Sequence, residues 1–545
     1  MAPADAGFCV VVQGLRDQVA RLEKSPFAAR LAASPYGKAV RESPEVRKLA
    51  HIDEQLRTHL NVSWAQLRDD ILGDAVVLAY TPGPPDHPEA EQGLLLVHAR
   101  RPDLLAGLLD RLNDQQQKAG ELTAVDRREH RGQGYVVRRK KAGGTEVYFL
   151  RGPVLAFTDS EAALRAAIDR DQNARPADAD PPTVSARLRA LGVDRDFVVW
   201  WVNPRAFDAA LAAKVASVKG VEAAILGAFE RYWKALDGAA VSVALGRDPT
   251  VNLAVQARTD ALPAPARRLL AEAARPSAVW ASFPDNALFA AAGRVPWDAA
   301  AEAGSEFLTA DARRDVQDAV ERTVGAILGR DVLPQLLRHL GPDWGVCVMP
   351  PESGDRGWLP SLTAVLRLRP GEGKVPVEQR VLDGLDFVAR LAVLGYNGQR
   401  TEPLRLRVES QDGVDVRVIE GGRLPPGLQP AFAWKGGYLV LASTPEAVRR
   451  FVPPTRAADA APEPAEVPLV RLTLQGWAGY LRAYRGPVAA HLAEADKIPV
   501  AEAQARIDRW LDGLDLFDGV EVVQRTAAGR ATVTVRLKTL PRTGE

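Results

Sequence analysis

The sequence predicts an α+β protein of two homologous domains, each an antiparallel-rich β-sheet with helices packed mainly on one face. Three observations lead to this expectation. Similar blocks recur in the same order in the two halves of the 545 residues. Several segments alternate apolar and polar residues, which is typical of antiparallel strands with one buried face. Other segments begin with N-cap residues, which are typical of helix starts.

The repeat rests on six pairs of matching blocks. The clearest pair is residues 154–162 (VLAFTDSEA) and residues 439–447 (LVLASTPEA). The other pairs are Phe8 and Phe289, 72–74 and 340–343, 94–97 and 363–366, 134–138 and 413–417, and 236–238 and 517–519. Six matches in one order predict that a single ancestral module was copied and that the two halves fold alike.

The predicted boundaries are residues 1–260 for the first domain, 261–275 for a linker and 276–545 for the second domain. Either half is long enough to bury a core of its own. The linker contains two prolines in Leu262-Pro263-Ala264-Pro265. Because duplicated halves often bury the same patch against each other, we expect them to pack pseudo-symmetrically.

Two strand predictions specify burial. Residues 532–537 place valine or leucine at odd positions and threonine or arginine at even positions, which predicts a strand buried on one side only. Residues 251–256 alternate in a similar way. The continuous apolar run at 197–202 (FVVWWV) predicts a central strand covered on both faces.

Two predicted helices begin at matching places. Asp159 and Thr444 are expected N-caps, because their side-chain oxygens can accept hydrogen bonds from the first-turn N–H groups. Pro445 then fits the first helical position. Glu161 and Glu446 are expected at the second position, where the helix dipole favours a negative charge. The two matching glutamates thereby have a structural explanation without catalysis.

A third helix start, Ser43-Pro44-Glu45, opens a segment with one apolar stripe. The stripe consists of Val46, Leu49, Ile52, Leu56 and Leu60. Proline-rich segments at residues 81–88, 171–182 and 453–468 are predicted to be exposed connectors.

Charge and cysteine content exclude several classes of protein. Lys and Arg number 70 against 69 Asp and Glu, which argues against a nucleic-acid or anionic-membrane partner. The basic run at 138–141 precedes two glycines and predicts a solvated hairpin tip. Cys9 and Cys347 lie in apolar runs, so we expect buried thiols rather than a disulfide or a zinc site.

No sharp catalytic motif is present in the sequence. A phosphate-binding loop, a Gly-x-Ser-x-Gly elbow, a His-Glu-x-x-His helix and a Cys-x-x-Cys pair are all missing. Gly132-Gln133-Gly134 is interpreted as a turn that enters a strand. No segment reaches the roughly 18 to 20 apolar residues of a membrane span. The N-terminus lacks the features of a signal peptide, which predicts a cytoplasmic protein unless the true start lies upstream.

A few titratable residues are weak candidates for a site. Glu129 and His130 could form an acid–base pair, but they lie in a charged run that is typical of a solvated surface. Asp69, Asp70 and Asp74 could chelate a hard cation, although no regular ligand spacing follows. The remaining candidates are Asp86, His87, Glu89 and Glu91 in the proline-rich loop, and His98 at a strand end.

The second half argues against assigning these residues a function. At the places that match Glu129-His130 and His98 it carries Gln411-Asp412 and Arg367. What the halves share is glycines, apolar strand residues and cap residues. We therefore predict no catalytic, no cofactor-binding and no metal-binding residue, and we expect no cofactor.

The start at residues 3–8 (PADAGF), residues 72–79 (LGDAVVLA) and the segment 147–168 together resemble a broad group of uncharacterised bacterial proteins. Those proteins are large, duplicated and often exported or membrane-anchored. The resemblance implies the duplicated architecture, and it brings no catalytic residues with it. Its members usually begin with an export signal or anchor helix, which this chain lacks, so the resemblance leaves both a cytoplasmic and an envelope location open.

The function expected from the sequence is a non-catalytic binding or scaffold protein, associated in one interpretation with the cell envelope. A first alternative is a carrier that holds an apolar ligand in a groove between sheet and helices. A second alternative is a hydrolase of unrecognised type. The hydrolase would require Glu129, His130 or Asp74 to converge in a cleft.

Overall fold

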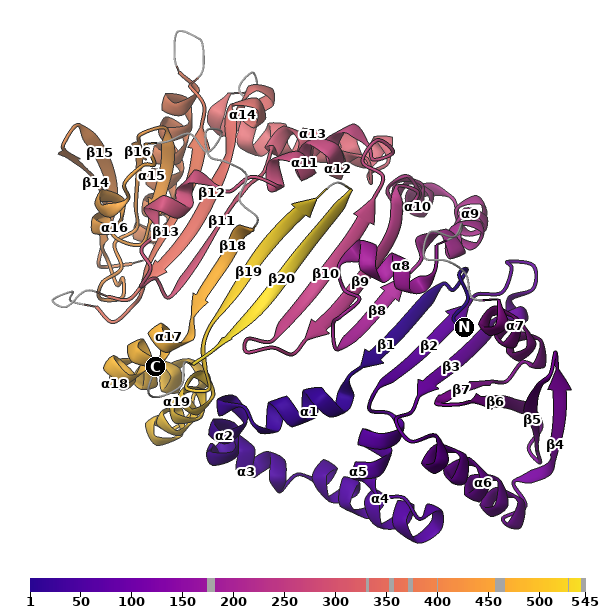
Figure 1. Ribbon diagram of the computed structural model, residues 1–545. Coiled ribbons are helices and arrows are strands. Elements are labelled where there is room, and N and C mark those ends of the chain that lie inside the picture. Colours follow the sequence, from indigo (N-terminus) through magenta and orange to yellow (C-terminus); the bar gives the residue numbers. More distant parts are fainter. Residues whose placement is uncertain are drawn as a thin grey trace.

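A single antiparallel sheet runs through the whole molecule (Figure 1). The computed structural model describes residues 1–545 except 174–181, 330–332, 352–356, 371–375, 399, 456–465, 528 and 541–545. In the described residues the sheet has twenty strands, and helices fill the connections between them. The predicted mixture of helices and antiparallel strands is confirmed.

The strands of residues 8–257, the N-terminal portion, lie side by side in a fixed order. From the edge inward they are β4 (Leu122–His130), β5 (Gln133–Lys140), β6 (Thr145–Arg151), β7 (Val154–Thr158), β3 (Gln92–His98), β2 (Ala75–Thr81), β1 (Phe8–Gln13), β8 (Val198–Val202), β9 (Leu236–Ala244) and β10 (Thr250–Ala257).

The strands of residues 289–539, the C-terminal portion, follow the same order from the opposite edge. They are β14 (Leu404–Gln411), β15 (Val414–Gly421), β16 (Ala431–Lys435), β17 (Tyr438–Ala442), β13 (Ser361–Leu368), β12 (Leu340–Met349), β11 (Phe289–Arg294), β18 (Val467–Thr473), β19 (Phe517–Ala527) and β20 (Arg530–Thr539). Strands β10 and β20 pair antiparallel, with Val251 opposite Val535, so the two portions share one sheet.

Helices connect the strands of the N-terminal portion and line its edges. They are α1 (Leu15–Glu23), α2 (Pro26–Ala33), α3 (Pro35–Arg41), α4 (Pro44–Leu60), α5 (Trp64–Gln66), α6 (Pro102–Lys118), α7 (Glu161–Gln172), α8 (Val184–Leu191), α9 (Asp208–Ser217) and α10 (Gly220–Trp233). The predicted linker contains helix α11 (Ala264–Ala273).

The helices of the C-terminal portion are α12 (Trp297–Ser305), α13 (Ala310–Leu328), α14 (Leu333–His339), α15 (Val377–Asn397), α16 (Pro445–Arg450), α17 (Leu474–Ala483), α18 (Arg485–Asp496) and α19 (Val500–Leu514). In Figure 1, helices α1–α5 and α17–α19 lie along one long edge of the sheet, and α9–α14 lie along the other.

Helices pack on both faces of the sheet rather than mainly on one. Leu164 of α7 packs with Phe149 in one apolar cluster. Leu105 of α6 packs with Tyr148, which points to the opposite face because it neighbours Phe149 in β6. The C-terminal portion is similar: α16 and the short helix Ala278–Ser282 pack on one face, and α15 packs on the other. The outer strands are therefore buried on both sides.

Edge helices of each portion contact the other portion. Phe27 of α2 stacks on Phe517 with ring centroids 5.1 Å apart, and the Tyr36 hydroxyl donates to the carbonyl of Arg509 in α19. At the opposite edge, Tyr232 of α10 stacks on Phe307 with centroids 5.5 Å apart. The connection between the portions is consequently supported at the β10–β20 pairing and at both long edges of the sheet.

The predicted helix starts are confirmed in one case and shifted in the other. The Thr444 hydroxyl accepts from the N–H of Ala447, and Pro445 and Glu446 occupy the first two positions of α16. In α7 the cap is Ser160, whose hydroxyl accepts from the N–H of Ala163, so Asp159 is not the cap. Glu161 is therefore the first residue of the helix and not the second.

The Ser43 start is confirmed, but the apolar stripe behind it is not covered. The Ser43 hydroxyl accepts from the N–H of Val46 at 3.3 Å, as expected of an N-cap. Val46, Leu49 and Ile52 are 38 to 42% exposed. Helix α4 thus presents apolar side chains to solvent, whereas the sequence pattern alone is typical of a helix packed against a core.

Both cysteines are buried and free, as predicted. Burial raises the pKa of Cys9 to about 12 and that of Cys347 to about 11, because the thiolate loses its hydration. Both thiols are therefore kept in the protonated, unreactive form. The predicted connectors at 171–182 and 453–468 lie mostly outside the described residues.

Candidate functional site

The residues that a hydrolase would need do not converge. Nε2 of His130 lies 2.9 Å from Oδ1 of Asp169 in α7, and Glu129 is exposed. Asp74 instead contacts Nδ1 of His98 and Nη1 of Arg16, each at 3.5 Å. Strands β5, β6, β7 and β3 lie between the strand of His130 and the strand that follows Asp74.

The candidate metal ligands are also held by other partners. Asp69 receives two hydrogen bonds from the guanidinium of Arg68, at 2.7 and 2.8 Å. In the proline-rich loop, His87 pairs with Glu89, and Glu91 accepts from the hydroxyl of Tyr80. The described part of the chain holds no cluster of three or more His, Cys, Asp or Glu side chains with the geometry of a metal site.

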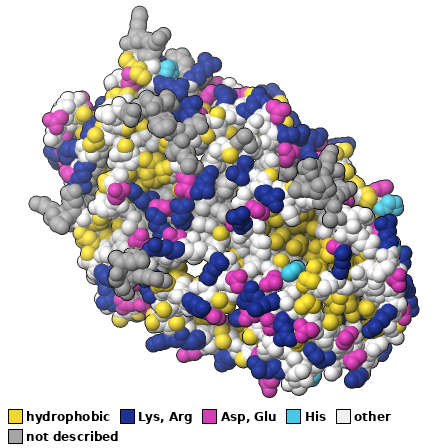
Figure 2. Space-filling view, in the orientation of Figure 1, with side chains coloured by type: hydrophobic (Ala, Val, Ile, Leu, Met, Phe, Trp, Pro, Cys, Tyr) yellow, Lys and Arg dark blue, Asp and Glu magenta, His cyan; other side chains and the backbone are white. Residues whose placement is uncertain are grey.

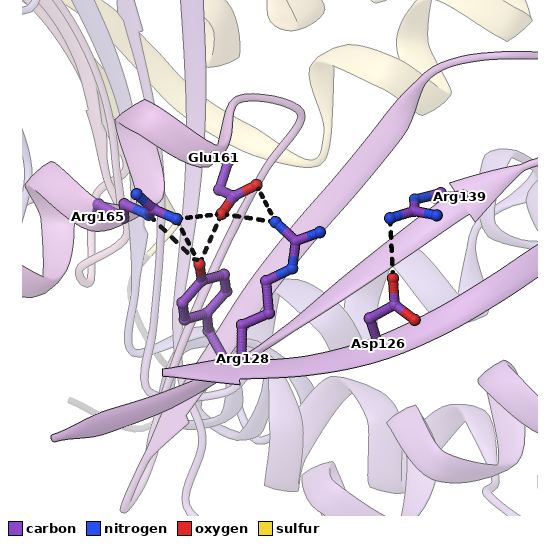
Figure 3. Close-up of polar contacts among 6 residues, drawn as sticks. Asp126, Arg128, Arg139, Glu161 and Arg165 are labelled. Carbon is purple, nitrogen blue, oxygen red and sulfur yellow. Dashed lines mark hydrogen bonds and ion pairs between the residues drawn. The ribbon is translucent and has the colours of Figure 1, made fainter. Parts of the chain in front are cut away.

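Glu161 is the centre of a polar cluster on the outer strands (Figure 3). Its carboxylate accepts from the hydroxyl of Tyr135 at 2.6 Å, from Arg128 at 2.9 Å and from Arg165 at 2.6 Å. The Tyr135 hydrogen bond, followed by those from the two arginines, lowers the pKa of Glu161. Every group in the cluster is engaged by another, so the cluster fastens α7 to β4 and β5.

The basic run at 138–141 is only partly a solvated hairpin tip. The turn is present, with Gly143 and Gly144 at φ of 90° and 92°. Arg138, however, is 3% exposed, and its Nη1 lies 3.0 Å from Oε2 of Glu146. The prediction of a fully solvated run was wrong because a carboxylate on the neighbouring strand neutralises this arginine. Arg139 pairs with Asp126 at 3.1 Å, also drawn in Figure 3.

One face of the central strands is apolar and uncovered; we call it the open face. It consists of three rows of paired residues across β2, β1, β8, β9, β10 and β20. The rows are Val76, Val12, Val198, Val243, Val251 and Val535; Leu78, Val10, Trp200, Val241, Leu253 and Val533; and Tyr80, Phe8, Val202, Ala239, Val255 and Ala531. Directly paired residues point to the same face, so the rows form one surface.

The open face is exposed although it contains no charged side chain. Six of its residues are between 39% and 56% exposed, the highest value being that of Trp200. Their neighbours along the strands point to the opposite face and are buried, as Cys9, Trp201 and Ala254 illustrate. Helix α8 packs there, with Leu188 in the same cluster. Among the described residues, α6 covers the open face at its β2 end, where Val76 packs in the α6 cluster. Helix α15 packs beyond the open face, on strands β12 to β17.

Two burial predictions are corrected by this arrangement. Thr534 is buried and Val535 is exposed, so the apolar side of residues 532–537 is the uncovered side. The run at 197–202 does form the central strand β8, but Trp200 shows that one of its faces is open. A chain of hydrogen bonds on the other face allows polar side chains to be buried there, because they satisfy each other.

That chain of hydrogen bonds crosses from one portion to the other. The hydroxyl of Ser242 donates to the carboxylate of Asp196, and Nδ2 of Asn252 donates to the same carboxylate at 3.1 Å. The hydroxyl of Thr534 donates to Oδ1 of Asn252 at 2.8 Å. These polar residues can be buried at little cost because each has a partner.

A pocket of about 600 Å³ lies at the edge of the sheet, between helices α1 and α2 and the ends of β9, β10 and β20. Arg21, Lys24 and Arg247 line it together with apolar residues that include Leu22 and Phe27. Among the described residues that line it there is no carboxylate. The pocket therefore combines an apolar wall with a positive rim.

The space-filling view shows a different kind of surface. On the face seen in Figure 2, Lys and Arg side chains are mixed with Asp and Glu side chains, and no extended region has one sign. One such mixture on the polar side of the central strands joins Glu466 to Arg536, at 3.1 Å. Charged side chains are therefore abundant on the face seen in Figure 2, whereas the three rows of the open face contain none.

Comparisons of the chain with family models, with curated proteins and with solved structures gave no match. Within the part of the chain that the structure describes, no helix has the length and apolar character that crossing a bilayer requires. The function is therefore inferred from the geometry of the described residues.

Sequence reasoning missed the open face and the pocket. A signal for the open face was present in three strands, where Ser242, Asn252 and Thr534 alternate with valine and leucine. Polar residues at facing positions of adjacent strands can bond each other, which leaves the apolar side free to be the exposed one. Arg21 and Lys24 carry no such signal, because only the fold brings them to the sheet edge.

Proposed function

We propose that the protein is a non-catalytic binding protein that carries a lipid, with the hydrocarbon part of the lipid lying on the open face. The observation that carries the proposal is the exposure of Trp200, Leu253 and their neighbours in three rows that are apolar except for the hydroxyl of Tyr80. Full burial of one such side chain is worth about 1.5 to 3 kcal/mol. Covering six that are now about half exposed would therefore yield several kcal/mol.

The chemistry of the open face favours hydrocarbon over a protein partner. A protein interface usually contains about one hydrogen bond per 100 to 200 Å². The open face offers few such groups, because its side chains are apolar and the strand backbones already pair with each other. A hydrocarbon chain needs no hydrogen-bond partner. Surfaces of this kind on soluble chains mark binding sites.

We also propose that the open face arose by duplication, with residues 1–260 and 276–545 as the two copies. The proposal is supported by the identical order of the strands from β4 to β10 and from β14 to β20. Joining two such sheets at β10 and β20 widens the uncovered surface. Six strands at about 4.8 Å spacing span roughly 24 Å between the outer strands.

The test is binding of the neutral apolar probe N-phenyl-1-naphthylamine, followed by its fluorescence. We expect Leu253→Asp to weaken probe binding at least tenfold, because a charge would sit in the middle row. The control is Leu394→Asp on α15, which changes the most exposed large apolar residue to the same charge. The control variant should bind as the unaltered protein does. Equal binding by all three proteins would overturn the proposal.

A second measurement separates a lipid from a second copy of the chain. Sedimentation of the unaltered protein should give the mass of one 58.9 kDa chain, with lipid detected by native mass spectrometry. A dimer that Leu253→Asp dissociates would assign the open face to self-association and overturn the lipid proposal. Both aspartate variants should keep the thermal midpoint of the unaltered protein within a few degrees, because both sites are exposed.

A further inference from the structure

We infer that the lipid has an anionic head group, which binds in the pocket lined by Arg21, Lys24 and Arg247. This inference rests on the proposed function and specifies its ligand. Three properties of the pocket carry it: its continuity with the open face, its charge, and a buried polar atom without a partner.

The pocket continues the open face at the ends of three strands. Just after the end of β9, Leu245 is the next alternate residue after Val241 and Val243. Pro249 likewise lies at the alternate position before Val251 of β10, and Thr539 lies at the second alternate position after Val535 of β20. Alternate positions of a strand share a face. The open face therefore leads into the wall of the pocket, so a single ligand can occupy both.

The charge of the pocket is positive and is not cancelled by the residues that line it. Within the described part of the chain, neither the side chain of Arg21 nor that of Lys24 forms an ion pair or hydrogen bond. Asp248 lies close in sequence, but Oδ1 of this residue accepts from the N–H of Thr539 at 2.9 Å. An anion in the pocket would thus meet two available cations and no carboxylate of the lining.

A third property is Oε1 of Gln18, which is buried at the pocket without a hydrogen-bond partner among the described residues. An unpaired buried acceptor is costly, so a bound O–H group or water would stabilise it. Leu22 and Phe27 supply apolar contacts next to it, and Leu22 is largely exposed. The volume of about 600 Å³ accommodates a carboxylate or phosphate with the first methylene groups of its chain.

The experiment compares ligands that differ only in the head group: palmitate, hexadecanol and monohexadecyl phosphate. Each is titrated as a competitor of N-phenyl-1-naphthylamine at alkaline pH, where the carboxylate is ionised. We expect both anions to bind at least tenfold more tightly than hexadecanol. Raising the salt concentration from about 50 mM to about 500 mM should weaken the binding of the two anions and leave the binding of the alcohol unchanged. A preference between palmitate and the phosphate identifies the head group.

The double variant Arg21→Gln/Lys24→Gln should lower the affinity for palmitate about tenfold and change the affinity for hexadecanol less than twofold. The matched control is Arg47→Gln/Lys48→Gln, a pair of exposed basic residues on α4. This control variant should change the affinity for neither ligand. Equal affinity for palmitate and hexadecanol, or equal loss in both double variants, would overturn the head-group site and leave the lipid proposal standing. Absence of any effect of Leu253→Asp would overturn the lipid proposal itself.

Discussion

Asp74 and Asp343 occupy corresponding places in the two portions but different environments. Asp74 directly precedes β2, and Asp343 lies near the start of β12, opposite Arg294. Each contacts a basic side chain of the third strand, His98 or Arg367. Asp74 is 31% exposed, whereas the side chain of Asp343 is completely buried. The comparison shows one ion-pair geometry used once at the surface and once inside the molecule.

Burial changes what the aspartate must bond. Oδ1 of Asp343 accepts from the hydroxyl of Ser277 at 2.9 Å and from the N–H of Ala278 at 3.1 Å. Oδ2 lies 3.3 Å from Nη1 of Arg367 and 3.6 Å from Nη1 of Arg294. The surface aspartate has two partners at 3.5 Å and is partly exposed to solvent. A buried charge requires full coordination, and a surface charge does not.

The largest effect is expected from Asp343→Asn. Removing this charge takes a buried carboxylate from Arg294 and Arg367, which should lower the free energy of unfolding by about 1.5 to 3 kcal/mol, because Arg294 keeps Glu272 and Arg367 is partly exposed. Denaturant unfolding followed by circular dichroism measures the change. A loss below about 1 kcal/mol would mean that the buried cluster contributes no more than a surface pair.

An intermediate effect is expected from Glu161→Gln. The change weakens the contacts with Tyr135, Arg128 and Arg165, which should lower the free energy of unfolding by about 1 kcal/mol. The lowered pKa of Glu161 fixes the pH dependence. Its contribution is complete above the unfolded value of about 4.3 and is lost as the pH falls through the lower folded value. Acid unfolding curves of the variant should therefore converge with those of the unaltered protein at low pH.

The control for that change is Glu446→Gln in α16, the matching helix start of the C-terminal portion. Among the described residues Glu446 pairs with Arg449 alone, at 3.1 Å, and its side chain is half exposed. We expect its removal to have a smaller effect at neutral pH than the removal of Glu161. Equal effects would show that the three-partner cluster of Figure 3 adds nothing to an ordinary helix-terminal glutamate.

The smallest effect is expected from Asp74→Asn. Its contacts with His98 and Arg16 are 3.5 Å long and partly exposed to solvent. The free energy of unfolding should therefore fall by less than about 1 kcal/mol. The same denaturant titration measures it. A loss as large as that of Asp343→Asn would end the distinction between the partly exposed aspartate and the buried one.

The sequence predicted local features better than burial. Residues 532–537 form the expected strand, since alternation identifies which residues share a face. Alternation does not identify which face is covered, because that depends on α8, which comes from residues far along the chain. Asp159 and Ser160 can both cap a helix, and only the backbone geometry selects Ser160.

The candidate sites were less predictable for a related reason. The buried cluster around Asp343 combines Ser277, Arg294 and Arg367 from separate segments. The pocket at the sheet edge likewise needs α1, α2 and three strand ends. No short motif records such a combination. The residues of the open face were visible as apolar strands, but their exposure depends on which helices the fold brings to that face.

The pairing of β10 with β20 has a consequence for the order of events during synthesis. Strand β10 leaves the ribosome about 280 residues before its partner, since Val251 pairs with Val535. At translation rates of about 5 to 20 residues per second, its edge stays unpaired for roughly 15 to 60 s. An unpaired edge is a template for association with other chains. Nascent chains of this protein are therefore most vulnerable to aggregation late in translation, just before the last hairpin emerges.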